Sequence, residues 1–144
     1  TRFWEGATLI YQVRGEWFDA VSTLFAFCNH SPEWADRVKT FRHTLIRLTS
    51  LLYCSALQQV CDVDDDRFEI IESRGMDQES LNFMELSHDR VEVVMQWIQR
   101  LIVDAQAVGT IDISAPLLTR AFQELSHGMV SLNNAKKIKD IPFP

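Results

Sequence analysis

The sequence predicts an all-α fold, an antiparallel bundle of four long helices plus one or two short helices, formed as a single helical domain over residues 1–144. Apolar residues recur at intervals of three and four along four segments, which is the period of a helix with a buried face. No alternating strand pattern of comparable length is present. With 47% hydrophobic and 24% charged residues, the chain has the composition of one globular domain and is too short for two independent cores.

The first predicted helix spans about residues 3–28 and is apolar around most of its circumference. One row recurs every seven residues and comprises Trp4, Tyr11, Phe18 and Phe25. A second apolar row lies beside it and comprises Ile10, Trp17, Val21, Leu24 and Cys28. Such a helix has to be enclosed on several sides, so a further neighbour, such as another subunit, is expected. Gly6 and Gly15 are expected to mark close helix approaches or bends.

The second predicted helix starts at Ser31 and Pro32 and continues to about Val60. Ser31 is a suitable N-cap residue, and proline is tolerated in the first turn because its missing N–H is not needed there. The helix has a regular seam that comprises Trp34, Val38, Phe41, Leu45, Leu48 and Leu52. Its length is about 43 Å at 1.5 Å per residue, which is long for a globular protein.

Two further long helices are predicted in the second half of the chain. Asp89 is the candidate cap of the first, and Gly109 is its expected end. Its seam comprises Val91, Val94, Ile98, Leu101, Ala105 and Val108. Residues 110–113 are expected to be an extended connector. Ser114 and Pro116 start the last helix, which is expected to end after Asn133-Asn134 and has a face that comprises Leu118, Phe122, Leu125, Met129 and Leu132.

The chain has a net charge of −6, and its acidity is concentrated in the middle. Residues 62–104 carry twelve acidic and four basic side chains, and each flanking segment carries one more basic than acidic residue. General affinity for nucleic acid phosphates is therefore not expected. Residues 62–66 resemble the start of a calcium loop, but Arg67 and Ser73 stand where an EF-hand needs glycine and glutamate, so a solvated turn is predicted. Short helices are predicted near residues 68–75 and from Asp77.

No catalytic, metal or cofactor site is expected. The four histidines share no metal-ligand spacing with one another or with paired carboxylates, and no P-loop, GxGxxG or GxSxG motif is present. Cys28, Cys54 and Cys61 form no CxxC pair, and core packing is favoured for them over redox chemistry. Cys54 and Cys61 are expected to lie on one helix face. An enzyme is therefore not predicted.

Several motifs in order along the chain resemble the bestrophin family of anion channels, most closely its algal and protist members. Residues 1–4 (Thr-Arg-Phe-Trp) resemble the RWW signature that follows the second transmembrane helix, with Phe3 in place of the first tryptophan. Residues 48–52 are similar to the next long helix, and Trp97 with residues 109–111 resembles the W…EGRI stretch. Residues 133–135 and 140–144 resemble the segment that leads into the third transmembrane helix.

The resemblance implies that the chain is the extramembrane region between the second and third transmembrane helices of a longer protein. It implies a homopentamer of identical subunits that conducts chloride or other small anions, anchored in a membrane through flanking segments, with this domain on the cytosolic (or stromal or matrix) side. It further implies that Ile141 before Pro142 sets a narrow pore aperture and that Arg2, Phe3 and Trp4 lie at the membrane boundary. The family's acidic calcium clasp has no counterpart in this segment.

A second hypothesis stays open beside the channel. The heptad-spaced aromatic row of the first helix could bind a partner helix in a free-standing adaptor or scaffold domain. Ile141 also has an alternative interpretation, as a plain core residue in a proline-rich turn. The channel interpretation predicts two apolar segments of about 20 residues on each side of the chain, whereas the adaptor predicts soluble flanks.

Overall fold

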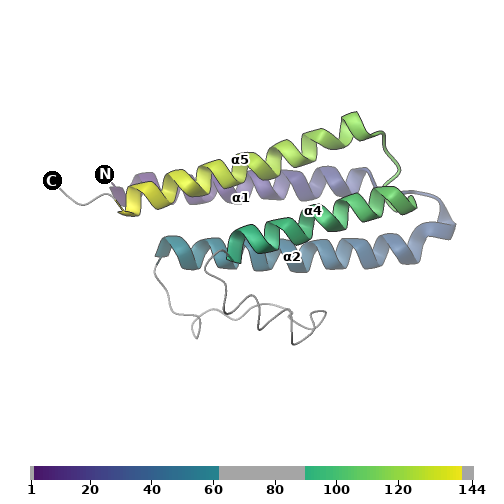
Figure 1. Ribbon diagram of the computed structural model, residues 1–144, viewed down its shortest axis with the longest axis horizontal. Helices are drawn as coiled ribbons and strands as arrows, with labels where there is room; N and C mark the ends of the chain where they lie inside the picture. The colour runs from purple at the N-terminus through teal and green to yellow at the C-terminus, as the bar shows by residue number, and fades with distance from the viewer. Residues whose placement is uncertain (1, 62–89, 141–144) are drawn as a thin grey trace.

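The computed structural model describes residues 2–61 and 90–140 and is all-helical there, with four long helices packed against each other (Figure 1). The helices are α1 (Arg2–Ala26), α2 (Ala35–Cys61), α4 (Arg90–Val108) and α5 (Ala115–Asp140), and a 3-10 turn, η1 (Pro32–Trp34), precedes α2. The predicted all-α class is therefore confirmed. The short helices predicted between residues 62 and 89, the solvated turn there and the Asp89 cap lie outside the described residues.

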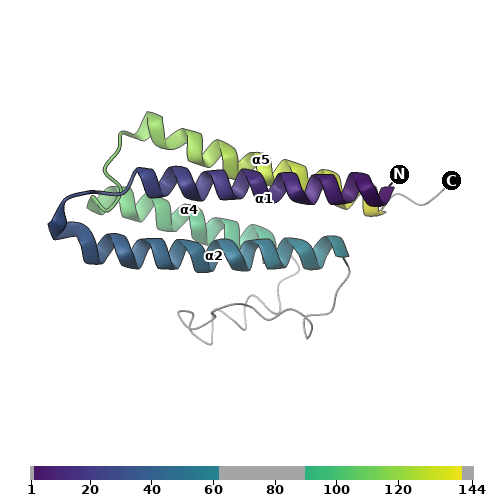
Figure 2. The same ribbon diagram turned by 180° about the vertical axis from the view of Figure 1, so that it is seen from behind.

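The four helices form two close pairs. α1 packs mainly against α5, and α2 packs mainly against α4, while sparser contacts of α2 with α1 and α5 join the pairs. Each pair runs antiparallel, so that the start of α1 and the end of α5 lie at the same end of the molecule (Figures 1 and 2). Among the described residues, the α1–α2 contact is sparser than the α1–α5 contact, so one side of α1 is left partly uncovered there.

All four helices contribute to one apolar core. Its largest fully buried side chains include Ile111 from the connector after α4 and two from each helix, namely Trp17, Leu24, Leu45, Leu52, Ile98, Ile102, Leu125 and Leu132. These residues recur by threes, fours or sevens on their helices, as the apolar periodicity predicts. Val108 was expected on the buried seam of α4 but is exposed at the helix end, and Ile102 is buried instead.

The helix ends follow local chemistry, with two differences from the prediction. α4 stops at Gly109, whose φ of 98° is the left-handed conformation expected of a C-terminal glycine. η1 begins after Ser31, but the Ser31 side chain makes no cap hydrogen bond. Its backbone N–H instead donates to Oδ1 of Asn29 at 3.0 Å. The second difference is that α5 does not end after Asn134 but continues to Asp140, since Ala135 is buried on the same face as Leu132 and extends the seam by a turn.

Hydrogen bonds join two connectors at the end of the molecule opposite the start of α1 and the end of α5 (Figure 1). Residues 28 and 111 form an isolated antiparallel bridge. Beside it, the backbone N–H of Asn29 donates to the carbonyl of Thr110 at 2.8 Å, and the Asn29 side chain donates to the carbonyl of Gly109 at 3.1 Å. The extended connector predicted at residues 110–113 is therefore confirmed, and it holds the end of α1 to the end of α4.

Candidate functional site

The buried face of α1 is centred on Trp17, which is 1% exposed. Its indole Nε1 donates a hydrogen bond to the carbonyl of Leu125 in α5 at 3.1 Å. The ring lies so close to Gly128 that a Cβ at that position would overlap it. One turn along α5, the Ser131 hydroxyl donates to the Glu16 carboxylate at 3.2 Å. Trp17 therefore fixes the position of α1 on α5.

The heptad row of α1 faces away from this core. The exposed fractions of Trp4, Tyr11 and Phe18 are 68%, 71% and 68%, respectively, and we call these three residues the aromatic stripe. Phe25, the fourth member of the row, is partly buried against the core. Among the described residues α1 is covered mainly by α5 and more sparsely by α2, and the further neighbour expected for its aromatic face stays a prediction.

The residues expected at the membrane boundary lie in the first turn of α1. Arg2, Phe3 and Trp4 are helical in backbone, and Trp4 is the one of the three whose side chain the structure describes. This turn lies beside the C-terminal end of α5 (Figure 2). Ile141 and Pro142, the expected pore aperture, lie outside the described residues. The chain enters them directly from α5, so the expected departure from the helix after Asn134 is wrong.

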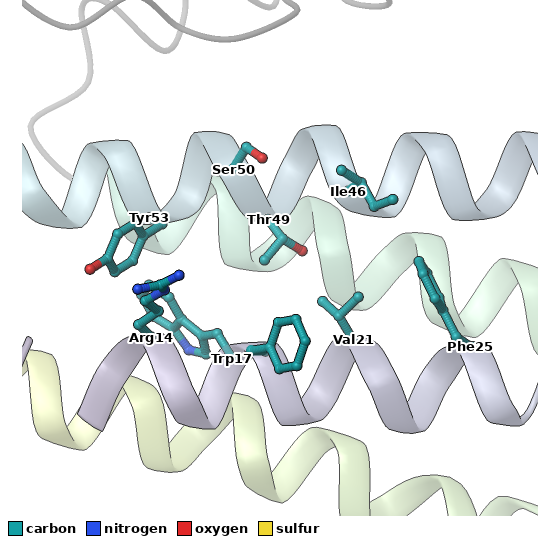
Figure 3. A pocket seen from close by; sticks show the side chains of 9 residues that line it. Arg14, Trp17, Val21, Phe25, Ile46, Thr49, Ser50 and Tyr53 are labelled. Atoms are coloured by element: carbon teal, nitrogen blue, oxygen red, sulfur yellow. The ribbon is translucent and has the colours of Figure 1, made fainter. Parts of the chain in front are cut away.

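A groove of about 330 Å³ runs between α1 and α2 on the open side of α1 (Figure 3). Nine side chains line it, namely Arg14, Trp17, Phe18, Val21, Phe25, Ile46, Thr49, Ser50 and Tyr53. Its wall is almost entirely apolar and contains no acidic residue. Phe18 and Ile46 form exposed rims. This groove could not be predicted from the sequence, because it depends on how α2 is placed along α1.

The polar groups of the groove gather toward one end. Arg14 and Tyr53 lie opposite each other at that end, and Thr49 points toward α1 one turn along α2 (Figure 3). The Thr49 hydroxyl oxygen is buried and has no hydrogen-bond partner among the described residues. Arg14 is exposed, and its side chain makes no hydrogen bond or ion pair with any described residue. The other end of the groove, around Val21 and Phe25, is lined by hydrocarbon side chains.

Arg42 lies beyond the apolar end of the groove, and its guanidinium already contacts Phe25. Its Nη2 donates to the carbonyl of Phe25 at 3.4 Å, and its guanidinium lies 5.2 Å from the centre of the Phe25 ring, within cation–π range. Arg42 therefore ties α2 to the end of α1, and Arg14 is the cation that the groove leaves free.

Of the described cysteines, Cys28 is part of the buried core and Cys54 is half-buried. Burial raises the pKa of the Cys28 thiol, an effect that the neighbouring Arg42 partly opposes, and Cys28 Sγ donates to the carbonyl of Leu24 at 3.4 Å. Burial also raises the pKa of the Cys54 thiol. Both thiols therefore stay protonated at neutral pH, which makes them poor nucleophiles. The Cys61 side chain lies outside the described part, so the shared face of Cys54 and Cys61 stays a prediction.

The described residues contain neither a metal-binding cluster nor a membrane-spanning helix. Among residues 2–61 and 90–140, no three His, Cys, Asp or Glu side chains are grouped closely enough to hold a metal ion. No helix in that part of the chain combines the length and hydropathy needed to cross a bilayer.

Comparison with known proteins identifies no relative. No protein-family model, no curated protein and no solved structure matches the chain.

Proposed function

We propose that this chain is the helical extramembrane domain of a subunit of a bestrophin-like, homopentameric chloride channel. It lies on the cytosolic (or stromal or matrix) side, where it forms part of the vestibule wall and the contact between identical subunits. The observation that carries the proposal is the aromatic stripe. Exposed apolar surface of this kind typically marks an interaction site, and a ring repeats the same pair of contacting patches around its axis.

The placement of the helix ends supports a position between two membrane helices. Because the start of α1 and the end of α5 lie side by side, segments before Arg2 and after Asp140 can leave from the same end of the domain (Figure 1). An insertion between two neighbouring membrane helices needs this arrangement. Arg2, Phe3 and Trp4 then lie at the membrane boundary, where aromatic rings and arginine side chains are favourable.

Ile141 before Pro142 is the proposed pore aperture, and no catalytic role is proposed for any residue. Proline restricts the preceding residue to an extended backbone. Directly after α5, five copies of Ile141 could converge on a fivefold axis and form an apolar constriction. Such a ring restricts ions by size and by the cost of dehydration rather than by binding them.

The decisive experiment uses the intact protein in two steps. The gene should encode two apolar segments of about 20 residues on each side of these 144 residues. Mass photometry of the intact protein in detergent should then give a pentamer. A stable dimer would contradict the proposal, and so would soluble flanks on both sides.

A free-standing adaptor domain is the second candidate, and the same aromatic stripe favours it. Heptad spacing on an exposed helix face suits the docking of one partner helix. The flanking sequences separate the candidates, because an adaptor needs no apolar segments. Stoichiometry separates them as well, because an adaptor forms a one-to-one complex with its partner.

A further inference from the structure

The groove between α1 and α2 has the size and lining of a ligand site. Its volume of about 330 Å³ falls at the lower end of the range of small-molecule pockets, which are mostly apolar with a few polar groups that fix orientation. Phe18 is 68% exposed and Ile46 is 47% exposed at its rims. A ligand that covers these rims would remove apolar surface from water, which is favourable.

The unsatisfied groups of the groove define the chemistry of its ligand. Arg14 is a cation without an acidic neighbour in the groove, and the buried Thr49 hydroxyl has no partner among the described residues. A buried hydroxyl without a hydrogen bond is costly. A carboxylate at this end would accept from the Arg14 guanidinium, and it would accept from the Thr49 hydroxyl once rotation of that side chain turns its buried oxygen into the groove. The ligand therefore needs a negatively charged head group at the Arg14 end of the groove.

The rest of the groove defines the tail. From Arg14 to Phe25 the groove follows eleven residues of α1, about 17 Å at the rise of an α-helix. Beyond Thr49 its lining comes from Val21, Phe25 and Ile46, which offer no hydrogen-bonding side-chain group. An extended hydrocarbon chain fits such a path, whereas a polar tail would lose its hydration without compensation.

We propose that this groove binds one free fatty carboxylate per chain, with the carboxylate at Arg14 and Thr49 and the hydrocarbon chain running toward Phe25. An apolar helix from a second copy is the competing occupant. It would leave both Arg14 and Thr49 without a partner, so the charge and the buried hydroxyl favour the carboxylate. The inference concerns the groove of a single chain and does not depend on the channel proposal.

Calorimetric titration of the 144-residue chain with laurate, kept below its micelle concentration, tests the inference. We expect saturable binding with one site per chain. Arg14→Gln should weaken the affinity about tenfold, because it removes a charge-assisted hydrogen bond. Thr49→Val keeps the shape of the side chain and should weaken the affinity about threefold to tenfold. Dodecanol, which has the same chain length and no charge, should bind more weakly than laurate.

Arg100→Gln is the matched control, because Arg100 is also an exposed arginine, on α4, and its ion pair with Asp104 is outside the groove. It should leave the laurate affinity unchanged. Circular dichroism melting of each variant establishes that the fold is intact. No saturable binding, dodecanol binding as tightly as laurate, or equal weakening by Arg14→Gln and Arg100→Gln would overturn the inference. Self-association that Phe18→Glu abolishes, with no uptake of laurate, would assign the groove to a second copy and overturn it as well.

Discussion

The indole ring of Trp17 in α1 occupies the space that a Cβ on Gly128 in α5 would need. The ring is held there by its hydrogen bond to the carbonyl of Leu125, 3.1 Å away. A glycine in the middle of a helix costs roughly 1 kcal/mol relative to alanine. Gly128 offsets that cost by allowing the largest buried side chain of the core to lie against the backbone of α5.

Gly128→Ala should therefore destabilise the protein although alanine is the better helix former. We expect a loss of about 1 to 3 kcal/mol in the free energy of unfolding, because Trp17 or α5 has to move. Urea denaturation measures this change. Gly15→Ala is the matched control, since a Cβ at Gly15 meets nothing within 4 Å, and it should stabilise the protein by about 0.5 to 1 kcal/mol. If both variants gained the same free energy of unfolding, the contact between the Trp17 ring and Gly128 would not be tight.

The two described cysteines predict how stability depends on pH. Burial raises the pKa of Cys28 and Cys54 in the folded protein, so above the pKa of an unfolded thiol, about 8.5, the folded state holds more protons than the unfolded state. Stability is then present in full below that pH and falls as the pH rises above it. Each unit of pKa difference corresponds to about 1.4 kcal/mol.

Urea denaturation at pH 7 and at pH 10 of the wild type and of the Cys28→Ala, Cys54→Ala double variant isolates this contribution. The wild type should lose more stability between the two pH values than the double variant loses. Lysine and tyrosine titrate in both proteins, so their contribution cancels in the comparison. An identical loss in the two proteins would mean that the thiols titrate alike in the folded and unfolded states.

The aromatic stripe predicts which substitutions disrupt assembly of the intact protein. Tyr11→Glu should lower the fraction of pentamer measured by mass photometry, because it buries a charge in the proposed subunit contact. Val103→Glu is a control on α4 at an apolar position that is also exposed, and it should leave the pentamer intact. If the two variants assemble equally well, the stripe is not a subunit contact.

Ile141→Ala tests the proposed aperture in the intact channel. A wider constriction should change relative permeability among anions of different size more than it changes gating, because an apolar ring selects by size and dehydration. Reversal potentials under bi-ionic conditions measure the change. Unchanged selectivity with a loss of stability of about 2 to 5 kcal/mol would instead identify Ile141 as a core residue.

The long helices are predictable from the sequence because their signals are local. The seams around Leu45, Ile98 and Leu125 recur with the helical period, and Gly109 and Ser114 mark ends that short-range chemistry sets. The end of α5 is harder to predict. Asparagine disfavours a helix only mildly, so burial of Ala135 carries the helix past Asn134 to Asp140.

The contacts between helices are less predictable because they depend on residues far apart in the chain. Both apolar rows of α1 look alike in sequence, yet Trp17 is buried and Phe18 is exposed, since α5 covers only one of the rows. Gly6 and Gly15 were expected at close approaches or bends, but a Cβ at either would meet nothing within 4 Å, whereas Gly128 does lie at a close approach. The groove likewise appears only once α2 is placed beside α1.

Chloride flux from liposomes that contain the purified intact protein tests the central claim most directly. The channel proposal predicts that the intact protein releases trapped chloride at a rate that rises with the amount of protein. It also predicts that the rate depends on the size of the replacing anion. Protein that inserts into the liposomes as a stable oligomer and releases chloride no faster than empty liposomes would contradict the proposal.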